Sequence, residues 1–146
     1  MARYTSFVDL HLILRDDRGR VLLGGRQNTG WGDGQLALPA GHLEQDESAV
    51  TGIVRETWEE VGVVLVPEAL RLAHVMHHYT TAGRVALFFE TTRWSGEITN
   101  REPDKCTGWS FVDPDDPPAE VVPYVARALA LIATGERYSE GGWSAR

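Results

Sequence analysis

Three glutamates, Glu56, Glu59 and Glu60, are the residues of this chain best placed to do chemistry. Helical spacing over residues 48–61 puts them at i, i+3 and i+4, so that the three carboxylates project from one face. Like charges at these spacings destabilise a helix by roughly a few tenths of a kcal/mol per pair. A divalent cation such as Mg²⁺, which prefers oxygen ligands, would turn this repulsion into affinity. The spacing alone leaves two alternatives open, a metal site and an ordinary solvated acidic face.

A fixed pattern of residues surrounds these glutamates. Glu47 and Arg55 could pair and hold the preceding loop against the helix. The whole pattern consists of Gly41, Glu47, Arg55, Glu56, Glu59, Glu60, Gly62 and Val63. It resembles the defining motif of the Nudix hydrolase family. Seven of these positions require one residue type, and Val63 fills a position that takes any aliphatic residue. At roughly 7% usage per residue type, seven such matches arise by chance with a probability on the order of 10⁻⁸. Thr57 stands where an aliphatic residue is usual, but its size is close to that of valine, so we expect little effect.

The resemblance implies a role for each residue of the pattern, with Mg²⁺ as the expected ion and Mn²⁺ as the alternative. The expected metal ligands are Ala40, through its backbone carbonyl, Glu56, Glu59 and Glu60. The residues expected to keep the shape of the motif are Gly41, Glu47, Arg55 and Gly62.

A further ligand or catalytic base is expected from a loop before the last strand, as in many relatives. Residues 100–106 read NREPDKC, and Glu102 is the expected residue there. Glu97 competes with it, and Glu90 is a weaker alternative because it should lie within a strand. An ordinary surface glutamate is the plain alternative for all three. For the base that activates water we expect Glu56, with Glu102 as the alternate.

Hydrophobic periodicity and turn residues predict the elements that position this site. Helices are expected over residues 48–61 and 123–133, and strands over residues 4–15, 21–24, 36–38, 70–79, 84–94 and 109–112. In the first helix Ser48 is the expected N-cap, Gly62 the stop, and the candidates for the buried face are Ala49, Ile53, Trp58 and Val61. This order indicates an α/β fold. The resemblance specifies a Nudix-type α/β/α sandwich with a mixed sheet and a loop–helix–loop motif.

Size and charge limit the classes of function. The 146 residues, 42% hydrophobic and 24% charged, suit one globular domain over residues 1–146. No apolar run reaches the roughly 20 residues of a membrane span, so no membrane partner is expected. A net charge of −7 argues against a nucleic-acid partner, which needs a basic face. The single cysteine, Cys106, fits the reducing cytoplasm. Residues 139–146 lack periodicity and are expected to form a mobile tail unless Trp143 docks.

The resemblance is to the MutT-like branch of the family, which implies a small nucleotide substrate cleaved by water at phosphorus. A nucleoside triphosphate would give a monophosphate and pyrophosphate, and ADP-ribose or a nucleotide sugar is the alternative substrate. The candidate substrate-binding residues are Arg26, Asn28 and His11. The aromatic residues that could stack on a base are Trp31, Tyr79, Phe89 and Trp109, although aromatic side chains more often lie in the core.

Four other interpretations of the sequence are possible. A Nudix-fold binding module without catalysis should have lost the carboxylates, all of which are present. An RNA-decapping enzyme would need a basic surface that this acidic chain lacks. A zinc site at His74, His77 and His78 matches no familiar ligand spacing, and a strand would turn His77 and His78 to opposite faces. A homodimer is an open expectation, because many relatives of the family pair.

Overall fold

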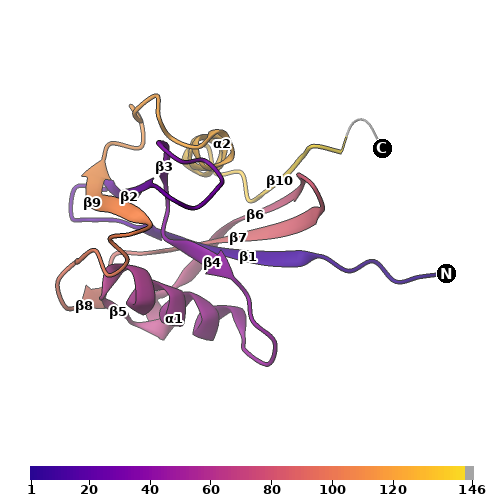
Figure 1. Ribbon diagram of the computed structural model, residues 1–146, viewed down its shortest axis with the longest axis horizontal. Helices are drawn as coiled ribbons and strands as arrows, with labels where there is room; N and C mark the ends of the chain where they lie inside the picture. The colour runs from indigo at the N-terminus through magenta and orange to yellow at the C-terminus, as the bar shows by residue number, and fades with distance from the viewer. Residues whose placement is uncertain (144–146) are drawn as a thin grey trace.

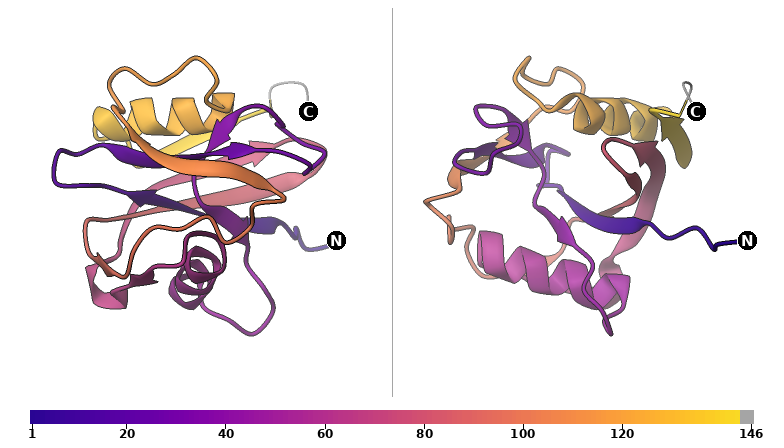
Figure 2. Two further views of the ribbon diagram at one scale, coloured as in Figure 1. Left: turned by 60° about the vertical axis from the view of Figure 1, so that its left-hand side comes forward. Right: turned by 45° about the vertical axis from the view of Figure 1, so that its right-hand side comes forward.

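A computed structural model describes residues 1–143 and shows helices on both sides of a mixed sheet. The strands are β1 (Phe7–Leu14), β2 (Val21–Arg26), β3 (Leu36–Ala37), β4 (Ala40–His42), β5 (Val64–Leu65), β6 (Arg71–Tyr79), β7 (Gly83–Thr91), β8 (Trp94–Ser95), β9 (Cys106–Val112) and β10 (Tyr138–Gly141). The helices are α1 (Ala49–Val61), the single-turn 3-10 helix η1 (Pro67–Ala69) and α2 (Pro123–Ala133). Figures 1 and 2 show α1 on one side of the strands and α2 on the other.

The central sheet has five strands in the order β10-β6-β7-β1-β4. The pairs β1–β7 and β6–β10 are parallel, whereas β6–β7 and β1–β4 are antiparallel, so the sheet is mixed as expected. A second sheet of three strands, β3-β2-β9, lies beside it, and β5 pairs with β8. The α/β/α sandwich predicted from the sequence is confirmed.

Alternation along β1 divides the core between the two helices. Leu10, Leu12 and Leu14 pack with Ile53 of α1 in one buried cluster. Ile13 belongs to the other cluster, with residues of α2. Successive side chains of a strand point to opposite faces, so this one strand serves both layers. Such burial on both faces fixes the register of β1 against β4, on which the site depends.

The ends of α1 agree with the prediction, and its buried face differs at one position. Ser48 caps the first turn by accepting from the N–H of Thr51, and Gly62 ends the helix in the left-handed region at φ 76°. Trp58, expected to be buried, is 46% exposed, and the buried residue is Thr57. Ile53, Thr57 and Val61 follow one another at intervals of four and form the inner line of the helix. Trp58 is the next residue after Thr57 and therefore points away from the inner line of the helix, where its ring stacks under Arg101.

The hydroxyl of Thr57 gives a first testable prediction. Its Oγ1 is buried and has no hydrogen-bond partner among the described residues. Thr57→Val keeps the shape and removes a desolvated polar group, so it should raise the free energy of unfolding by about 1 kcal/mol. Urea denaturation followed by tryptophan fluorescence measures this. Thr51→Val on the exposed side of the same helix is the control and should not stabilise, and a loss of stability in Thr57→Val would contradict the prediction.

Residues 139–146 are expected to be mobile unless Trp143 docks, and over the described part of this tail the structure shows the docked alternative. Tyr138–Gly141 forms β10 and adds to the edge of the sheet in parallel with β6. Trp143 Nε1 donates to the carbonyl of His77 at 2.9 Å, so this side chain docks. Polar residues formed this strand because a neighbouring edge offered unpaired backbone groups, which periodicity does not reveal. Residues 144–146 lie outside the described residues.

Three further strands were missed or displaced in the prediction. β4, β5 and β8 have only two or three residues each, and a pattern of period two cannot be recognised over such lengths. β4 matters most, because it carries Ala40 and Gly41 to the site. No helix over residues 1–143 has the length and apolar character needed to cross a bilayer.

Candidate active site

Arg55 joins the loop before α1 to the helix. Its guanidinium donates to both carboxylate oxygens of Glu47, Nη2–Oε1 at 2.8 Å and Nε–Oε2 at 3.0 Å. Glu47 also accepts from the N–H of Glu44 at 2.9 Å. These hydrogen bonds lower the pKa of Glu47 to about 2, and those from Arg55 contribute most. The Glu47 carboxylate is therefore ionised at neutral pH. The predicted pairing of Glu47 with Arg55 is confirmed.

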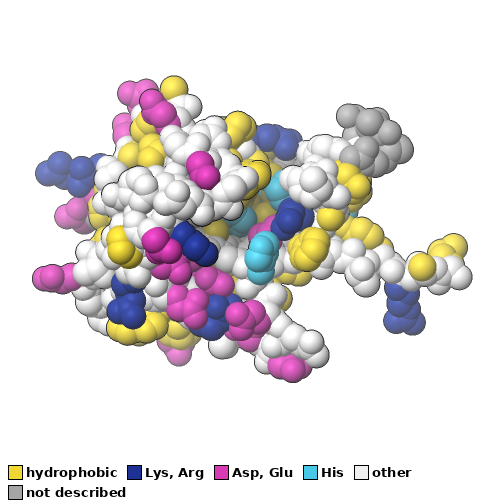
Figure 3. All heavy atoms as spheres, in the orientation of Figure 1, with side chains coloured by type: hydrophobic (Ala, Val, Ile, Leu, Met, Phe, Trp, Pro, Cys, Tyr) yellow, Lys and Arg dark blue, Asp and Glu magenta, His cyan; other side chains and the backbone are white. Residues whose placement is uncertain are grey.

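The same guanidinium reaches two of the expected metal ligands. Its Nη1 lies 3.0 Å from Glu56 Oε1 and 3.3 Å from Glu59 Oε2. The Glu56 side chain is 14% exposed and that of Glu59 is 49% exposed. With Glu44 at 3.6 Å and Glu47, one cation is therefore shared by four carboxylates, and most of their negative charge stays uncompensated. Figure 3 shows acidic side chains gathered over this part of the molecule with basic ones among them.

Gly41 allows β4 to approach α1 closely. A Cβ atom at Gly41 would overlap the carboxyl group of Glu56. Any side chain at this position would therefore displace that carboxylate. Glycine at this position therefore leaves the space that the Glu56 carboxylate occupies.

Glu60 extends from α1 to the backbone of β4. Its Oε1 accepts the N–H of Ala40 at 3.3 Å, and its own carbonyl accepts Nε1 of Trp109 at 3.3 Å. Burial, reinforced by the nearby Glu56, raises the pKa of the Glu60 carboxyl well above its usual range. An ionised carboxylate at this place is costly unless a positive charge shares it.

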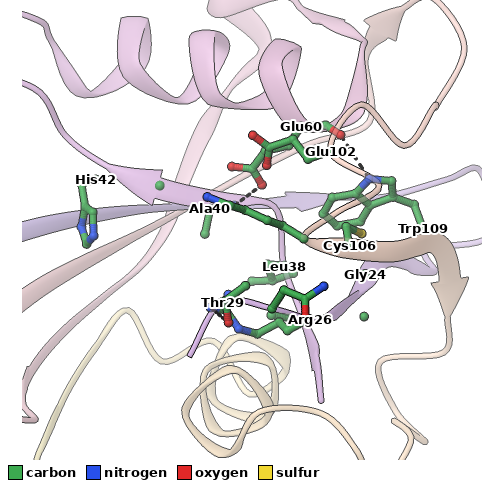
Figure 4. Close-up of a pocket in the computed structure, with 15 residues that line it drawn as sticks. Gly24, Arg26, Thr29, Leu38, Ala40, His42, Glu60, Glu102, Cys106 and Trp109 are labelled. Atoms are coloured by element: carbon green, nitrogen blue, oxygen red, sulfur yellow. Dashed lines mark hydrogen bonds between the residues drawn. The ribbon is translucent and has the colours of Figure 1, made fainter. Parts of the chain in front are cut away.

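A first cavity, of about 390 Å³, is lined by both Glu60 and Glu102. Figure 4 shows these two side chains on the same side of the cavity, next to Ala40. Burial raises the pKa of Glu102 as well. Gly41 also lines this cavity and contacts Glu56, whereas Glu59 lies on the exposed side of α1.

The two alternatives to Glu102 lie elsewhere. Glu97 is an exposed residue in the loop after β8. Glu90 lies on β7 and forms ion pairs with Arg15 and Arg71. Of these three glutamates, Glu102 is the one that lines the cavity. This placement supports Glu102 for the expected role.

The donor atoms at this site suit a hard divalent cation. The expected ligands are all oxygens, the kind that Mg²⁺ and Mn²⁺ take. Within residues 1–143 no three acidic, histidine or cysteine side chains gather around one point. The observation that fits a cation is the partly buried Glu60, whose raised pKa marks a negative charge without enough compensation.

A second cavity, of about 410 Å³, adjoins the first. The residues that line both are Arg26, Ala40, Gly41 and His42. The remaining side chains of the second cavity come from β1, β6, β7, α2 and two loops, and they are Asp9, His11, Trp31, His78, Thr80, Thr81, Arg84 and Tyr124. A ligand can therefore extend from the glutamates along β4 to the face of the sheet beneath α2.

Apart from Arg26, which also lines the first cavity, the charged side chains of the second cavity are paired with each other. His11 is buried, and its Nε2 lies 2.7 Å from Tyr124 Oη. Burial lowers the pKa of His11 to about 4 and raises that of Tyr124 to about 12, so both are neutral at pH 7. Asp9 and Arg84 neutralise each other through contacts of 3.1 Å. Such a cavity suits a neutral heteroaromatic group better than a phosphate.

The loop between β2 and β3 contributes to both cavities. Arg26 lines both; its guanidinium stacks 4.7 Å from the ring centroid of Trp31, and its Nε donates to the carbonyl of Trp31 at 2.8 Å. The Trp31 ring is half exposed and lines the second cavity. Asn28 lines the first cavity, but its Nδ2 donates to the carbonyl of Asp104 at 2.9 Å. Its amide is thus engaged by the protein itself.

The other aromatic candidates divide between the site and the core. Trp109 lines the first cavity, whereas Phe89 is buried in the core between the sheet and α1. Tyr79 packs against Trp143. Stacking on a substrate is therefore open to Trp31 and Trp109.

The three histidines considered for zinc have separate surroundings. His74 contacts the carbonyl of Glu136 and the hydroxyl of Ser139, both at 2.8 Å. His77 contacts Tyr4 and Trp143 on the other face of β6. His78 lines the second cavity. The expected divergence of His77 and His78 is confirmed, and His74 and Ser139 serve to attach β10.

Sequence reasoning missed several residues of the second cavity, among them Asp9, His78, Arg84 and Tyr124. Period-two alternation in β6 could have indicated that His78 faces the same way as His74. For Tyr124 no signal was available, because its place depends on how α2 packs over the sheet.

Comparison with known proteins agrees with this geometry. A family model described as the NUDIX domain matches residues 7–132. A MutT-like protein of Streptomyces ambofaciens is 34% identical over 105 residues, which make up 72% of this chain and 62% of that protein. The chain thus spans under two thirds of the length of this relative.

Solved structures show the same fold. The MutT Nudix hydrolase of Burkholderia pseudomallei superposes with a TM-score of 0.78 at 26% identity, over 87% of this chain and 98% of that one. The MutT protein of Methanosarcina mazei Go1 has a TM-score of 0.78 at 20% identity, over 92% and 97% of the two chains. Motif, fold and family model agree, and this chain belongs to the Nudix family.

Proposed function

We propose that the chain is a divalent-metal-dependent pyrophosphohydrolase that acts on a nucleoside triphosphate, with Mg²⁺ as the ion and Mn²⁺ as a substitute. The observation that carries this proposal is the partly buried Glu60, which lines a cavity with Glu102. That cavity adjoins a second one with a half-exposed tryptophan and polar walls. Phosphates and a nucleoside fit these two spaces in turn.

Metal ions bound at such a site neutralise phosphate oxygens and lower the pKa of water. The residues that would hold the metal are Ala40, through its carbonyl, Glu56, Glu59, Glu60 and Glu102. Arg26 lies between the cavities and would bind phosphate oxygens, while Asn28 and His11 were the other expected substrate contacts. The engagement of the Asn28 amide by Asp104 favours a different role for Asn28.

In the proposed reaction, water attacks phosphorus and the bond from phosphorus to the bridging oxygen breaks, with its electron pair going to the leaving phosphate. A carboxylate takes the proton from the attacking water. Glu56 is the proposed base and Glu102 the alternate. The ion pair with Arg55 orients Glu56. Burial raises the pKa of Glu102, which favours uptake of a proton by this carboxyl.

A substrate panel tests this function. Purified protein is assayed with the common nucleoside triphosphates, ADP-ribose and nucleotide sugars, with and without Mg²⁺, and phosphate, pyrophosphate and nucleoside monophosphate are measured. We expect Mg²⁺-dependent release of pyrophosphate and a monophosphate. Turnover of ADP-ribose or a nucleotide sugar alone would assign the alternative substrate. Tight nucleotide binding without turnover would instead identify a binding module, and sedimentation of the same protein tests the expected homodimer.

A further inference from the structure

Glu102 is placed in the cavity by its loop and not by bonds to its own carboxylate. Over residues 1–143 no hydrogen bond or ion pair is made by the Glu102 carboxylate. Its backbone N–H donates to Asn100 Oδ1 at 3.2 Å, and its carbonyl accepts from the N–H groups of Lys105 and Cys106, both at 2.9 Å. The loop conformation therefore decides where this carboxylate lies.

Three consecutive carbonyls follow Glu102, and all three accept hydrogen bonds from two neighbouring residues. Gln27 Nε2 donates to the carbonyl of Pro103 at 2.9 Å. Asn28 Nδ2 donates to the carbonyl of Asp104 at 2.9 Å. The backbone N–H of Gln27 donates to the carbonyl of Lys105 at 3.1 Å. Two of these three bonds come from side-chain amides. The contact between the two segments therefore depends on the side chains of Gln27 and Asn28, and not on backbone pairing alone.

The donating loop is itself fixed and carries substrate-facing residues. Arg26 donates to Thr29 Oγ1 at 3.0 Å and to the carbonyl of Trp31 at 2.8 Å. The carboxylate of Asp33 accepts from the N–H of Gly30 at 3.0 Å. Asn28 has φ 55°, a left-handed conformation that asparagine tolerates better than most residues. The loop from Arg26 to Asp33 and the turn after Glu102 are thus joined by hydrogen bonds, so that a displacement of one would displace the other.

We propose that Gln27 and Asn28 are positioning residues that hold Glu102 at the metal and phosphate site and couple its place to the loop that contacts the substrate. This inference rests on the proposed function, and it gives Asn28 a role different from direct substrate binding. An error of about 1 Å in the place of a catalytic group costs on the order of 100-fold in rate, so these amides should act mainly on kcat.

Isosteric variants separate positioning from packing. Asn28→Asp and Gln27→Glu keep the shape of the side chain, and aspartate tolerates the φ of 55° at position 28. Both variants put an oxygen against a carbonyl that needs a donor. Each should lower kcat by about 10- to 100-fold and change KM by less than about threefold. Gln45→Glu adds the same charge on an exposed residue of another loop and is the matched control, with kcat unchanged.

A double-mutant cycle with Glu102→Gln decides the matter. If the amides act through Glu102, Asn28→Asp should cause little further loss of kcat in the Glu102→Gln background. Binding of Mn²⁺ alone, measured by electron paramagnetic resonance, gives a readout that does not need turnover. Asn28→Asp should weaken Mn²⁺ binding in the parent chain and leave it unchanged when Glu102 is already glutamine.

Coupling in either measurement supports the inference. Equal losses in both backgrounds in both measurements overturn it, because the amides would then serve folding alone, and so does an effect confined to KM. Absence of turnover across the substrate panel contradicts the proposed function, and the Mn²⁺ cycle then decides the positioning role by itself. A chain that binds no Mn²⁺ and turns over no substrate overturns both.

Discussion

Glu60→Gln should lower turnover by at least about 1000-fold while the protein stays folded, and Glu59→Gln should act in the same direction. An amide oxygen carries no net charge, so the metal at the proposed site would lose one negatively charged ligand. A loss of about 4 kcal/mol of transition-state stabilisation corresponds to this factor. The measurement is kcat at saturating Mg²⁺ with the best nucleotide from the panel.

Stability provides the control for the same variant. Burial raises the pKa of Glu60 to about 9, so above the ordinary pKa of a glutamate the folded chain, without metal, must keep this carboxyl protonated while the unfolded chain is ionised, and stability falls as the pH rises. Glu60→Gln removes this dependence, because the amide is neutral in both states, and the urea midpoint at pH 8 should not fall. Glu97→Gln changes an exposed glutamate and should alter neither quantity. Near-normal activity of both Glu59→Gln and Glu60→Gln would refute the assignment of these ligands.

Arg55→Ala should have the second large effect, and it should affect stability as well as turnover. Arg55 contacts four carboxylates, and its removal leaves all four without their shared cation. They belong to Glu44, Glu47, Glu56 and Glu59. We expect a loss of about 2 kcal/mol in the free energy of unfolding, since the side chain is partly shielded from solvent, together with at least about a 100-fold loss of kcat. Urea denaturation and steady-state kinetics measure the two.

Arg55→Lys shows whether charge alone suffices. A lysine ammonium cannot donate to both oxygens of Glu47 and also reach Glu56 and Glu59. The Arg55→Lys variant should therefore keep only part of the stability that Arg55→Ala loses. Arg71→Ala is the matched control, because Arg71 is exposed and pairs with Glu90 alone, and it should cost under about 1 kcal/mol. Wild-type kcat in Arg55→Lys would show that turnover does not need the paired hydrogen bonds from the guanidinium to Glu47.

The sequence by itself determined the family, the helix α1 with its caps, and the pairing of Glu47 with Arg55. These features are local: the glutamates share a face because of the 3.6-residue turn, and Ser48 and Gly62 act on the helix end next to them. The inner face of α1 was predicted less well, because the hydrophobicity of Trp58 outweighed the interval of four that joins Ile53, Thr57 and Val61. The structure buries Thr57 and leaves Trp58 exposed.

Tertiary structure alone decided what surrounds the glutamates. The contacts of Gln27 and Asn28 with the turn after Glu102 join residues 76 positions apart, and no local pattern reports such a distance. The short β4, the second cavity under Tyr124 and the docking of Trp143 likewise depend on the order in which strands pair. Residue types and spacing are enough to specify a charge pattern on one helix. The place of a carboxylate from another loop is set by hydrogen bonds that exist only after the sheet has formed.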